Sequence, residues 1–252
     1  MKGLRLLILG IFLLSAMLAA APAGAQFWAK KDPAKWSKSE CQELLHHSPW
    51  ANEYRVARAV IEGIAGTATG GDPSVEGRSQ PFVNYSAVFL SAKPVRLAMI
   101  RLQQLDPKYE KLSPEDRQKF DENAAKFIDA DFSNQVVVQM TYETINAYNL
   151  PIARYWQTQS QEELRKVFVL VTAAGRIEPV QVIFQPGQNR GEFQLIYPRK
   201  IDGKEVLNAD FKQAGLEFPH PDIPEMRAVL PPERGFIPFP TKKMIVKDEL
   251  VY

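Results

Sequence analysis

The side chains with the most potential for chemistry lie in residues 40–47, which read ECQELLHH. On a helix, Glu43 is one turn from both His46 and His47, and a Glu-x-x-His pair can ligate a metal. Carboxylate di-metal sites need two such pairs, and the second is missing here. The third histidine of the chain, His220, is distant in sequence, and a site that combines it with His46 or His47 stays open.

A polar helix end is the alternative for this cluster, since histidine side chains favour the negative end of a helix dipole. A tetrahedral metal site needs three or four ligands, and the sequence does not supply a set that we can name. We therefore assign no catalytic, cofactor-binding or metal-binding residue, and we expect no cofactor.

Cys41 is the only cysteine, so the chain has no internal disulfide. It follows Lys38, Ser39 and Glu40, whereas a lipid-anchor cysteine would directly follow an apolar run. A nucleophilic thiol needs a lowered pKa and a nearby base, and the sequence marks neither. We expect Cys41 to be buried in a helix face, the usual place of an unpaired cysteine.

Motifs of several enzyme classes are absent from the sequence. It has no G-x-S-x-G, no H-E-x-x-H, no P-loop and no G-x-G-x-x-G. The glycine-rich residues 67–81 are therefore interpreted as a polar surface loop. Paired carboxylates that hydrolyse glycosides leave no signature in a single sequence, so a hydrolase using unrecognised Asp, Glu or His stays an open alternative.

The first 25 residues are typical of a cleaved secretory signal. Lys2 and Arg5 precede an uncharged apolar run over residues 6–21, and Ala-Gly-Ala at 23–25 suits a signal peptidase. The run is somewhat short of the roughly 20 residues that a spanning helix needs, and no later stretch is long enough. We expect a secreted or periplasmic protein that begins at Gln26 and has no transmembrane helix after cleavage.

The charge balance of the expected mature chain argues against nucleic acid as a partner. Of 31 Lys and Arg residues, two lie in the predicted signal, which leaves 29 against 29 Asp and Glu. Nucleic-acid binders usually show a basic excess or stripe. Protein, glycan and lipid ligands remain as possible partners.

Helices are predicted where apolar residues recur every three or four positions. Residues 34–47 form one such segment, which Ser48-Pro49 ends. Residues 94–105 form another, with proline in its first turn. Ser113-Pro114-Glu115-Asp116 opens a third, with a serine cap and acidic residues at the positive end of the helix dipole.

Strands are predicted for most of the remaining chain. Residues 82–90 and 135–144 alternate cleanly, and residues 54–64 fit a strand or a helix, of which we favour the strand. The clearest hairpin joins 179–184 to 191–197 around Gly187-Gln188-Asn189-Arg190. The remaining segments are a strand at 167–172, a proline-rich extended stretch at 218–240 and a closing strand at 242–252.

This order predicts an α+β fold rather than alternating βαβ units. We expect a mainly antiparallel sheet, as a sandwich or partial barrel, with an N-terminal helix and two further helices packed on one side. The chain would divide into a signal peptide at 1–25, a flexible lead-in at 26–33 and a single domain at 34–252.

Aromatic residues gather at both ends of the predicted domain. Trp28, Trp36 and Trp50 surround the first helix, and Phe218, Phe236 and Phe239 lie among prolines. We expect the tryptophans to pack the terminal helix onto the sheet. The alternative is an apolar groove between that helix and the sheet, where ligand pockets tend to form.

Several short phrases occur in a fixed order along the chain. A W-x-x-x-E-C helix is followed by SPWA at 48–51, SAKPVRLAMIRL at 91–102, IYPR at 196–199 and KKMIVKDELVY at 242–252. In this order they resemble a group of uncharacterised exported bacterial proteins. The resemblance implies export and a common fold, and it implies no activity, cofactor or site residue.

Together these observations favour an exported, non-enzymatic module that acts through binding or association with the cell envelope. The alternative is a secreted hydrolase that acts on envelope or extracellular polymers.

Overall fold

The computed structural model describes residues 26–57, 82–227, 230–247 and 249–252. The predicted signal peptide, the polar loop at 67–81 and the second half of the predicted strand at 54–64 lie outside these residues. Within them, no helix combines the length and apolar character needed to cross a bilayer.

The helical elements fall into two groups along the chain. The first group is α1 (Phe27–Lys30), the 3₁₀ turn η1 (Pro33–Lys35), α2 (Lys38–His46), α3 (Lys93–Gln104), α4 (Pro107–Glu110) and α5 (Pro114–Ile128). The second group is α6 (Asn146–Thr158) and α7 (Gln161–Val167). Two further 3₁₀ turns, η3 (Pro224–Met226) and η4 (Thr241–Lys243), lie near the C-terminus.

The strands form two main sheets and two small hairpins. The larger sheet has the order β1 (Ala51–Ala57), β2 (Phe82–Phe89), β3 (Gln135–Thr144), β7 (Arg190–Pro198), β6 (Gln181–Gly187). The smaller sheet has the order β11 (Gly235–Phe239), β10 (Ala214–Phe218), β4 (Val169–Thr172), β5 (Gly175–Ile177). The hairpins are β8 (Lys200–Ile201) with β9 (Lys204–Glu205), and β12 (Ile245–Val246) with β13 (Glu249–Leu250).

Every strand pairing in the two sheets is antiparallel, which confirms the predicted α+β fold. The sheets face each other across a core of aromatic rings, as in a sandwich. Phe218 of the smaller sheet lies 4.7 Å from Tyr85 of the larger one, between ring centroids. Phe239 and Phe89 are also 4.7 Å apart, and Phe168, beside β4, is 4.8 Å from Phe193.

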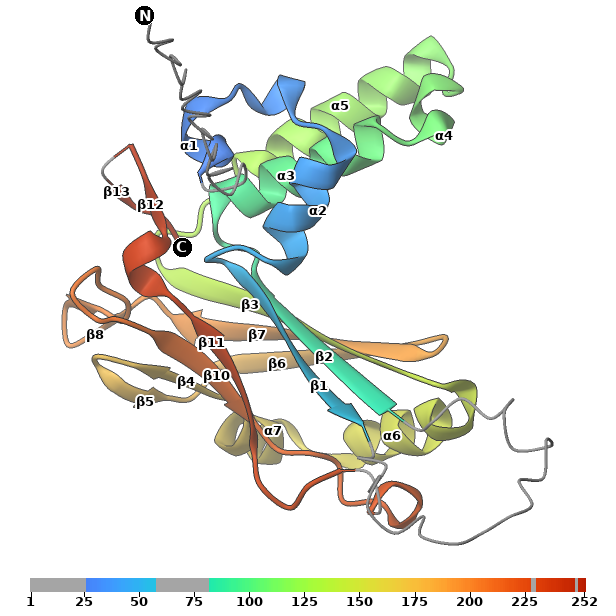
Figure 1. Ribbon diagram of the computed structural model, residues 1–252, viewed down its shortest axis with the longest axis vertical. Helices are drawn as coiled ribbons and strands as arrows, with labels where there is room; N and C mark the ends of the chain where they lie inside the picture. The colour runs from blue at the N-terminus through green and yellow to red at the C-terminus, as the bar shows by residue number, and fades with distance from the viewer. Residues whose placement is uncertain (1–25, 58–81, 228–229, 248) are drawn as a thin grey trace, which may run out of the picture.

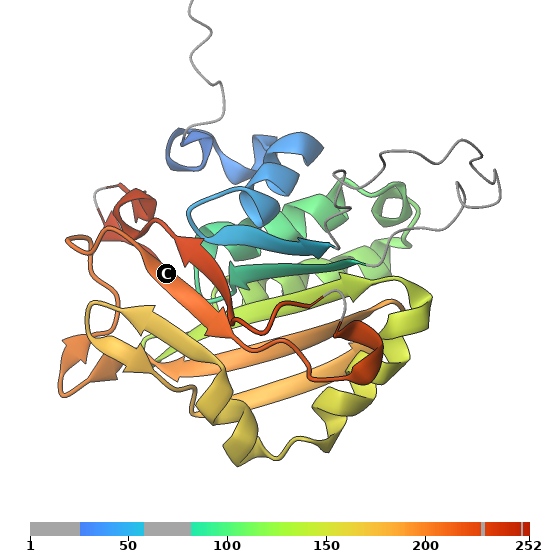
Figure 2. The ribbon, with the colours of Figure 1, turned by 60° about the horizontal axis from the view of Figure 1, so that its bottom comes forward.

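The two groups of helices occupy different parts of the molecule (Figure 1). Helices α1 to α5 gather at the end of the sandwich where β1 begins and β2 ends. Helices α6 and α7 lie on the same side of the larger sheet as the smaller sheet (Figure 2). Trp156 of α6 extends the core there, with its ring 5.2 Å from that of Phe193.

Arg96 holds the first group of helices to the larger sheet. Its side chain is buried, and its Nη1 donates to the carbonyl oxygens of Leu90 and Ser91 after β2. Nε and Nη2 both donate to the carbonyl of Ile128, at 3.1 and 3.0 Å. Ile128 is the last residue of α5, so a cation here also matches the negative end of that helix.

The alternating and capped segments fold largely as their sequences predict. Strand β3 spans Gln135–Thr144, and α5 begins at the predicted cap, where the amide of Asp116 donates to the Ser113 hydroxyl. The hairpin of β6 and β7 also forms, with a turn shortened to Gln188-Asn189. Asn189 takes a φ of 60°, a left-handed conformation that asparagine tolerates well.

Helices α6 and α7 occupy residues 146–167, where we predicted no helix. Pro151 lies inside α6, where a proline removes one backbone hydrogen bond. The start of α7 carries a capping box: the Glu163 amide donates to the Ser160 hydroxyl, and the Ser160 amide donates to the Glu163 carboxylate.

The two ends of the described chain also differ from the expectation. Residues 26–33, expected as a lead-in, contain α1, whose Phe27 and Trp28 pack against the core. Residues 242–252, expected as one closing strand, fold as the end of η4 and the β12–β13 hairpin. Lys247 in the hairpin turn has a φ of 50°, a left-handed conformation that ends a straight strand.

On the free edge of β6, a side-chain amide makes the two hydrogen bonds that a neighbouring strand would make. The Gln161 side chain of α7 donates to the carbonyl of Val182 at 2.6 Å and accepts from its amide at 3.2 Å. Edge strands with unpaired backbone groups are templates for aggregation, and this contact satisfies both backbone groups of Val182 on that edge.

Candidate functional site

The structure does not bring His46 and His220 together, which was the combination left open by the sequence. His46 Nδ1 lies 2.9 Å from Glu53 Oε1, while His220 stacks on Tyr54 with ring centroids 5.9 Å apart. Glu53 and Tyr54 are neighbours on β1, and neighbours on a strand point to opposite faces. The sheet therefore separates His46 from His220. No group of three His, Cys, Asp or Glu side chains suited to a metal occurs among the described residues.

Cys41 is fully buried in the face of α2 that packs on the core. Burial raises the pKa of its thiol, which keeps the sulfur protonated and unreactive. This position agrees with the predicted structural role of the residue.

A groove of about 430 Å³ lies between the N-terminal helices and the C-terminal hairpin. We call it the tryptophan groove. Its apolar lining includes Trp28, Trp36, Pro94, Leu97, Val246 and Val251. These residues come from α1, α3, the β12–β13 hairpin and the segments beside them, so the groove joins regions that are far apart in sequence.

Packing of the tryptophans shapes this groove. The Trp50 indole is buried and its Nε1 donates to the carbonyl of Val251 at 2.5 Å, which ties the C-terminal segment to the start of β1. Trp36 Nε1 donates to the Lys31 carbonyl at 3.2 Å. Trp28 is partly buried, with its ring edge-on to Trp50 at 5.4 Å. The tryptophans thus pack the terminal helices, as predicted. Two of them also line a groove, but it lies against α1, α3 and the C-terminal hairpin and not, as in the predicted alternative, between the first helix and the sheet.

Ammonium groups surround the apolar lining. Lys30, Lys31, Lys93 and Lys247 line the groove, against the carboxylates of Asp32 and Glu249. Two of these lysines have partners outside the groove: Lys31 Nζ lies 2.7 Å from Glu40, and Lys93 Nζ lies 2.7 Å from Asp129. The Lys93 pair is exposed at both ends, so it contributes little stability and leaves the lysine available to a ligand.

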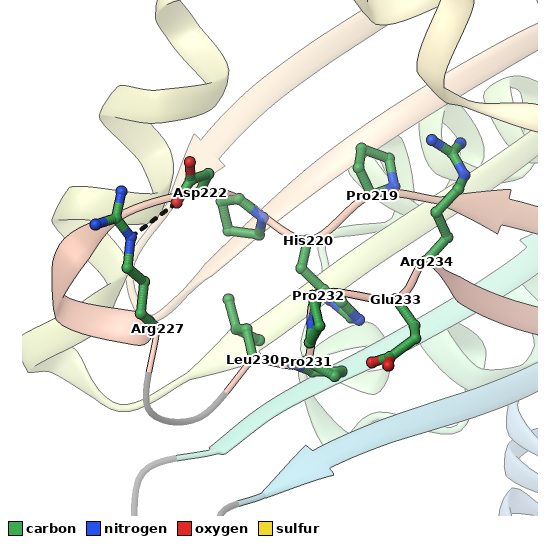
Figure 3. Close-up of a pocket in the computed structure, with 10 residues that line it drawn as sticks. Pro219, His220, Asp222, Arg227, Leu230, Pro231, Pro232, Glu233 and Arg234 are labelled. Atoms are coloured by element: carbon green, nitrogen blue, oxygen red, sulfur yellow. Dashed lines mark hydrogen bonds and ion pairs between the residues drawn. The ribbon is translucent and has the colours of Figure 1, made fainter.

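A second pocket, of about 460 Å³, surrounds His220 beside the smaller sheet. We call it the His220 pocket. In Figure 3, Asp222 and Arg227 lie on one side of the His220 ring, and Glu233 and Arg234 lie on the other. Asp222 forms an ion pair with Arg227 at 3.0 Å. The rest of the lining is Leu230 and four prolines, at positions 219, 221, 231 and 232.

His220 is a weak base in this environment. Desolvation lowers the pKa of its imidazole from 6.5 to about 4. Its Nδ1 lies 3.1 Å from the hydroxyl of Tyr85, whose own pKa is raised by burial. A general base works best when its pKa is near the operating pH, so the neutral ring is suited to hydrogen bonding rather than to proton abstraction.

Most residues that line the tryptophan groove and the His220 pocket could not be predicted from the sequence. The three tryptophans around the first helix suggested a groove between that helix and the sheet, whereas the tryptophan groove lies against α1, α3 and the C-terminal hairpin. Its other walls, Leu97 and Val251, carry no motif and meet only in the folded chain. The sequence identified His220 only as a histidine far from the other two. Its position between two prolines, directly after a strand, was the one local feature that could have drawn attention to it.

Comparison with known proteins returned no matching family model, no matching curated protein and no matching solved structure.

Proposed function

We propose that this chain is an exported binding protein whose tryptophan groove takes an amphipathic anionic molecule, such as a single acyl chain with a carboxylate head. The observation that carries the proposal is an apolar groove of about 430 Å³ lined by four lysines and two acids. An apolar ligand body would replace water against the indole rings and Leu97, which is favourable in proportion to the apolar area buried.

The lysines account for the charge of the ligand head. Four lysines line the groove, of which Lys31 and Lys93 already pair with Glu40 and Asp129 outside it. A carboxylate head would accept charge-assisted hydrogen bonds from these ammonium groups, which are stronger than neutral ones. Export is supported by the pattern of the first 25 residues, and intact-mass measurement of the exported protein should show a start at Gln26.

Titration with dodecanoate, followed by tryptophan fluorescence and calorimetry, tests the proposal. Dodecanoate should bind, and dodecanol should bind more weakly because it lacks the anionic head. Leu97→Glu places a carboxylate in the apolar wall and should weaken binding at least roughly tenfold. Leu150→Glu is the matched control, because Leu150 is 56% exposed on α6 and does not line the groove.

Charge reversal separates the contribution of the head from that of the chain. The double variant Lys93→Glu and Lys247→Glu should weaken dodecanoate more than dodecanol. The proposal is wrong if dodecanoate does not bind, or if Leu97→Glu binds it as tightly as the unchanged protein.

A further inference from the structure

The two segments that border the tryptophan groove, residues 26–38 and 241–251, are rich in lysine. Together they contain seven lysines and three acidic residues. The expected mature chain has equal numbers of basic and acidic residues, so this excess of positive charge is a local one. Lys31 pairs with Glu40 outside the two segments, which leaves an excess of three positive charges beside the groove.

The other six lysines are exposed and form no ion pair within the part of the chain that the structure describes: Lys30, Lys35, Lys38, Lys242, Lys243 and Lys247. Lys30 and Lys247 line the groove itself. Lys35 lies between Pro33 and Trp36, which also line it. These ammonium groups are therefore accessible to a partner that covers the groove.

The fold brings the two basic segments to one side of the molecule. Helix α1 and the β12–β13 hairpin lie on the same side in both views of the ribbon (Figures 1 and 2). The turn η4, which carries Lys242 and Lys243, leads directly into that hairpin. Helix α4 lies at the far end of the first group of helices (Figure 1). The basic segments thus border the groove from its N-terminal and its C-terminal wall.

The apolar groove between the lysines indicates which kind of anionic partner fits this surface. A lysine cluster alone attracts any polyanion. An anionic bilayer presents negative head groups and acyl chains together, so it matches lysines that flank an apolar groove. Aromatic residues beside lysines, such as Phe27 and Trp28 next to Lys30, are typical of segments at the bilayer–water interface.

We propose that residues 26–38 and 241–251 dock on the surface of an anionic phospholipid bilayer, with the tryptophan groove facing the lipid. This inference rests on the proposed function, because the bilayer then supplies the acyl ligand of the groove. The lysines that lie outside the groove contribute to docking alone, which makes docking and ligand binding separable by mutation.

Co-sedimentation of the mature protein with lipid vesicles tests the docking. We expect binding to vesicles of equal parts dioleoylphosphatidylcholine and dioleoylphosphatidylglycerol at low salt. Binding should be at least roughly tenfold weaker to vesicles of phosphatidylcholine alone, which have no net charge. Salt at about 0.5 M should also weaken it, because it screens exposed charges.

Charge reversal beside the groove separates docking from ligand binding. The double variant Lys35→Glu and Lys38→Glu should weaken binding to the anionic vesicles at least roughly tenfold. It should leave dodecanoate binding unchanged, because neither lysine lines the groove. The matched control is Lys108→Glu with Lys111→Glu, which makes the same charge change at α4 and should leave vesicle binding nearly unchanged.

Failure of the docking proposal is distinguishable from failure of the proposed function. Leu97→Gln, which makes the groove wall polar without changing its charge, should weaken dodecanoate binding and leave vesicle binding unchanged. Circular dichroism establishes that each variant folds. Docking is refuted if the anionic vesicles do not bind while dodecanoate does, if the Lys108 and Lys111 variant loses as much vesicle binding as the Lys35 and Lys38 variant, or if a short DNA duplex binds as tightly as the vesicles. Normal vesicle binding without dodecanoate binding supports the docking and refutes the ligand proposed for the groove.

Discussion

Two glycines of the smaller sheet lie under aromatic rings, and alanine at each should have different effects. A Cβ on Gly235 would lie 2.4 Å from Cζ of Phe218, its partner across β10 and β11. A Cβ on Gly215 would lie 2.0 Å from Cζ of Phe236. Neither glycine has a positive φ, so the backbone itself tolerates alanine at both positions.

The difference lies in where each ring can go. Phe218 is 0% exposed and packs on Tyr85, whereas Phe236 is 39% exposed and can rotate into water. Overpacking a core costs about 1–3 kcal/mol, and we expect Gly235→Ala at the upper end of that range. Gly215→Ala should cost less than about 1 kcal/mol, because the exposed ring moves aside.

Urea and thermal unfolding measure both variants. For a chain of this size, about 2–3 kcal/mol corresponds to a fall in melting temperature of roughly 4–12 °C. Adding Phe218→Leu to Gly235→Ala should recover part of the loss, because the smaller side chain leaves room for the methyl group. Equal losses for the two alanine variants, or no loss for Gly235→Ala, would refute this reasoning.

Four further outcomes follow from individual side chains. Because the folded pKa of His220 is about 4 against 6.5 unfolded, stability should fall as pH drops from 6.5 to 4. The full pKa shift corresponds to about 3 kcal/mol of unfolding free energy, and solvent screening of the partly exposed ring reduces this to about 2 kcal/mol. The variant His220→Gln should therefore lose this part of the pH dependence of stability, as measured by urea unfolding at each pH. Cys41 should resist a thiol reagent in the native protein and react fully in urea; rapid native labelling would contradict its burial. Arg96→Lys should lower the free energy of unfolding in urea by about 2–3 kcal/mol, because a lysine ammonium cannot reach all three carbonyls at once. An unchanged midpoint of the urea transition would show that the Arg96 guanidinium is not needed for stability. Gln161→Leu should destabilise by about 1–3 kcal/mol and promote self-association in light scattering, because it leaves both Val182 backbone groups unpaired, whereas a monomeric variant of normal stability would argue that the edge needs no cover.

Local sequence patterns predicted the elements whose stability is local or periodic. The alternation in β3 and the cap at Ser113 depend on neighbouring residues, so a single sequence contains them. Helix α7 could have been predicted from Ser160 and Glu163, which form a capping box. Helix α6 was harder, because Pro151 interrupts its periodicity and tertiary packing of Trp156 overrides that local preference.

The candidate sites could not be predicted to the same extent, because they are made by contacts between distant residues. His220 meets Tyr85 only because β2 and the segment after β10 face each other across the sandwich. Leu97 and Val251 share a groove because the C-terminal hairpin returns to the N-terminal helices. Neither convergence follows from spacing or composition.

The closing contact between Trp50 and Val251 has a kinetic consequence. It joins residues 201 positions apart, and the Asn52 side chain meets the Pro238 carbonyl across a separation of 186. Pairings this remote form only after nearly the whole polypeptide has been synthesised, and topologies rich in them fold slowly. The sandwich therefore closes only once the last residues of the chain are available to pair with the start of β1.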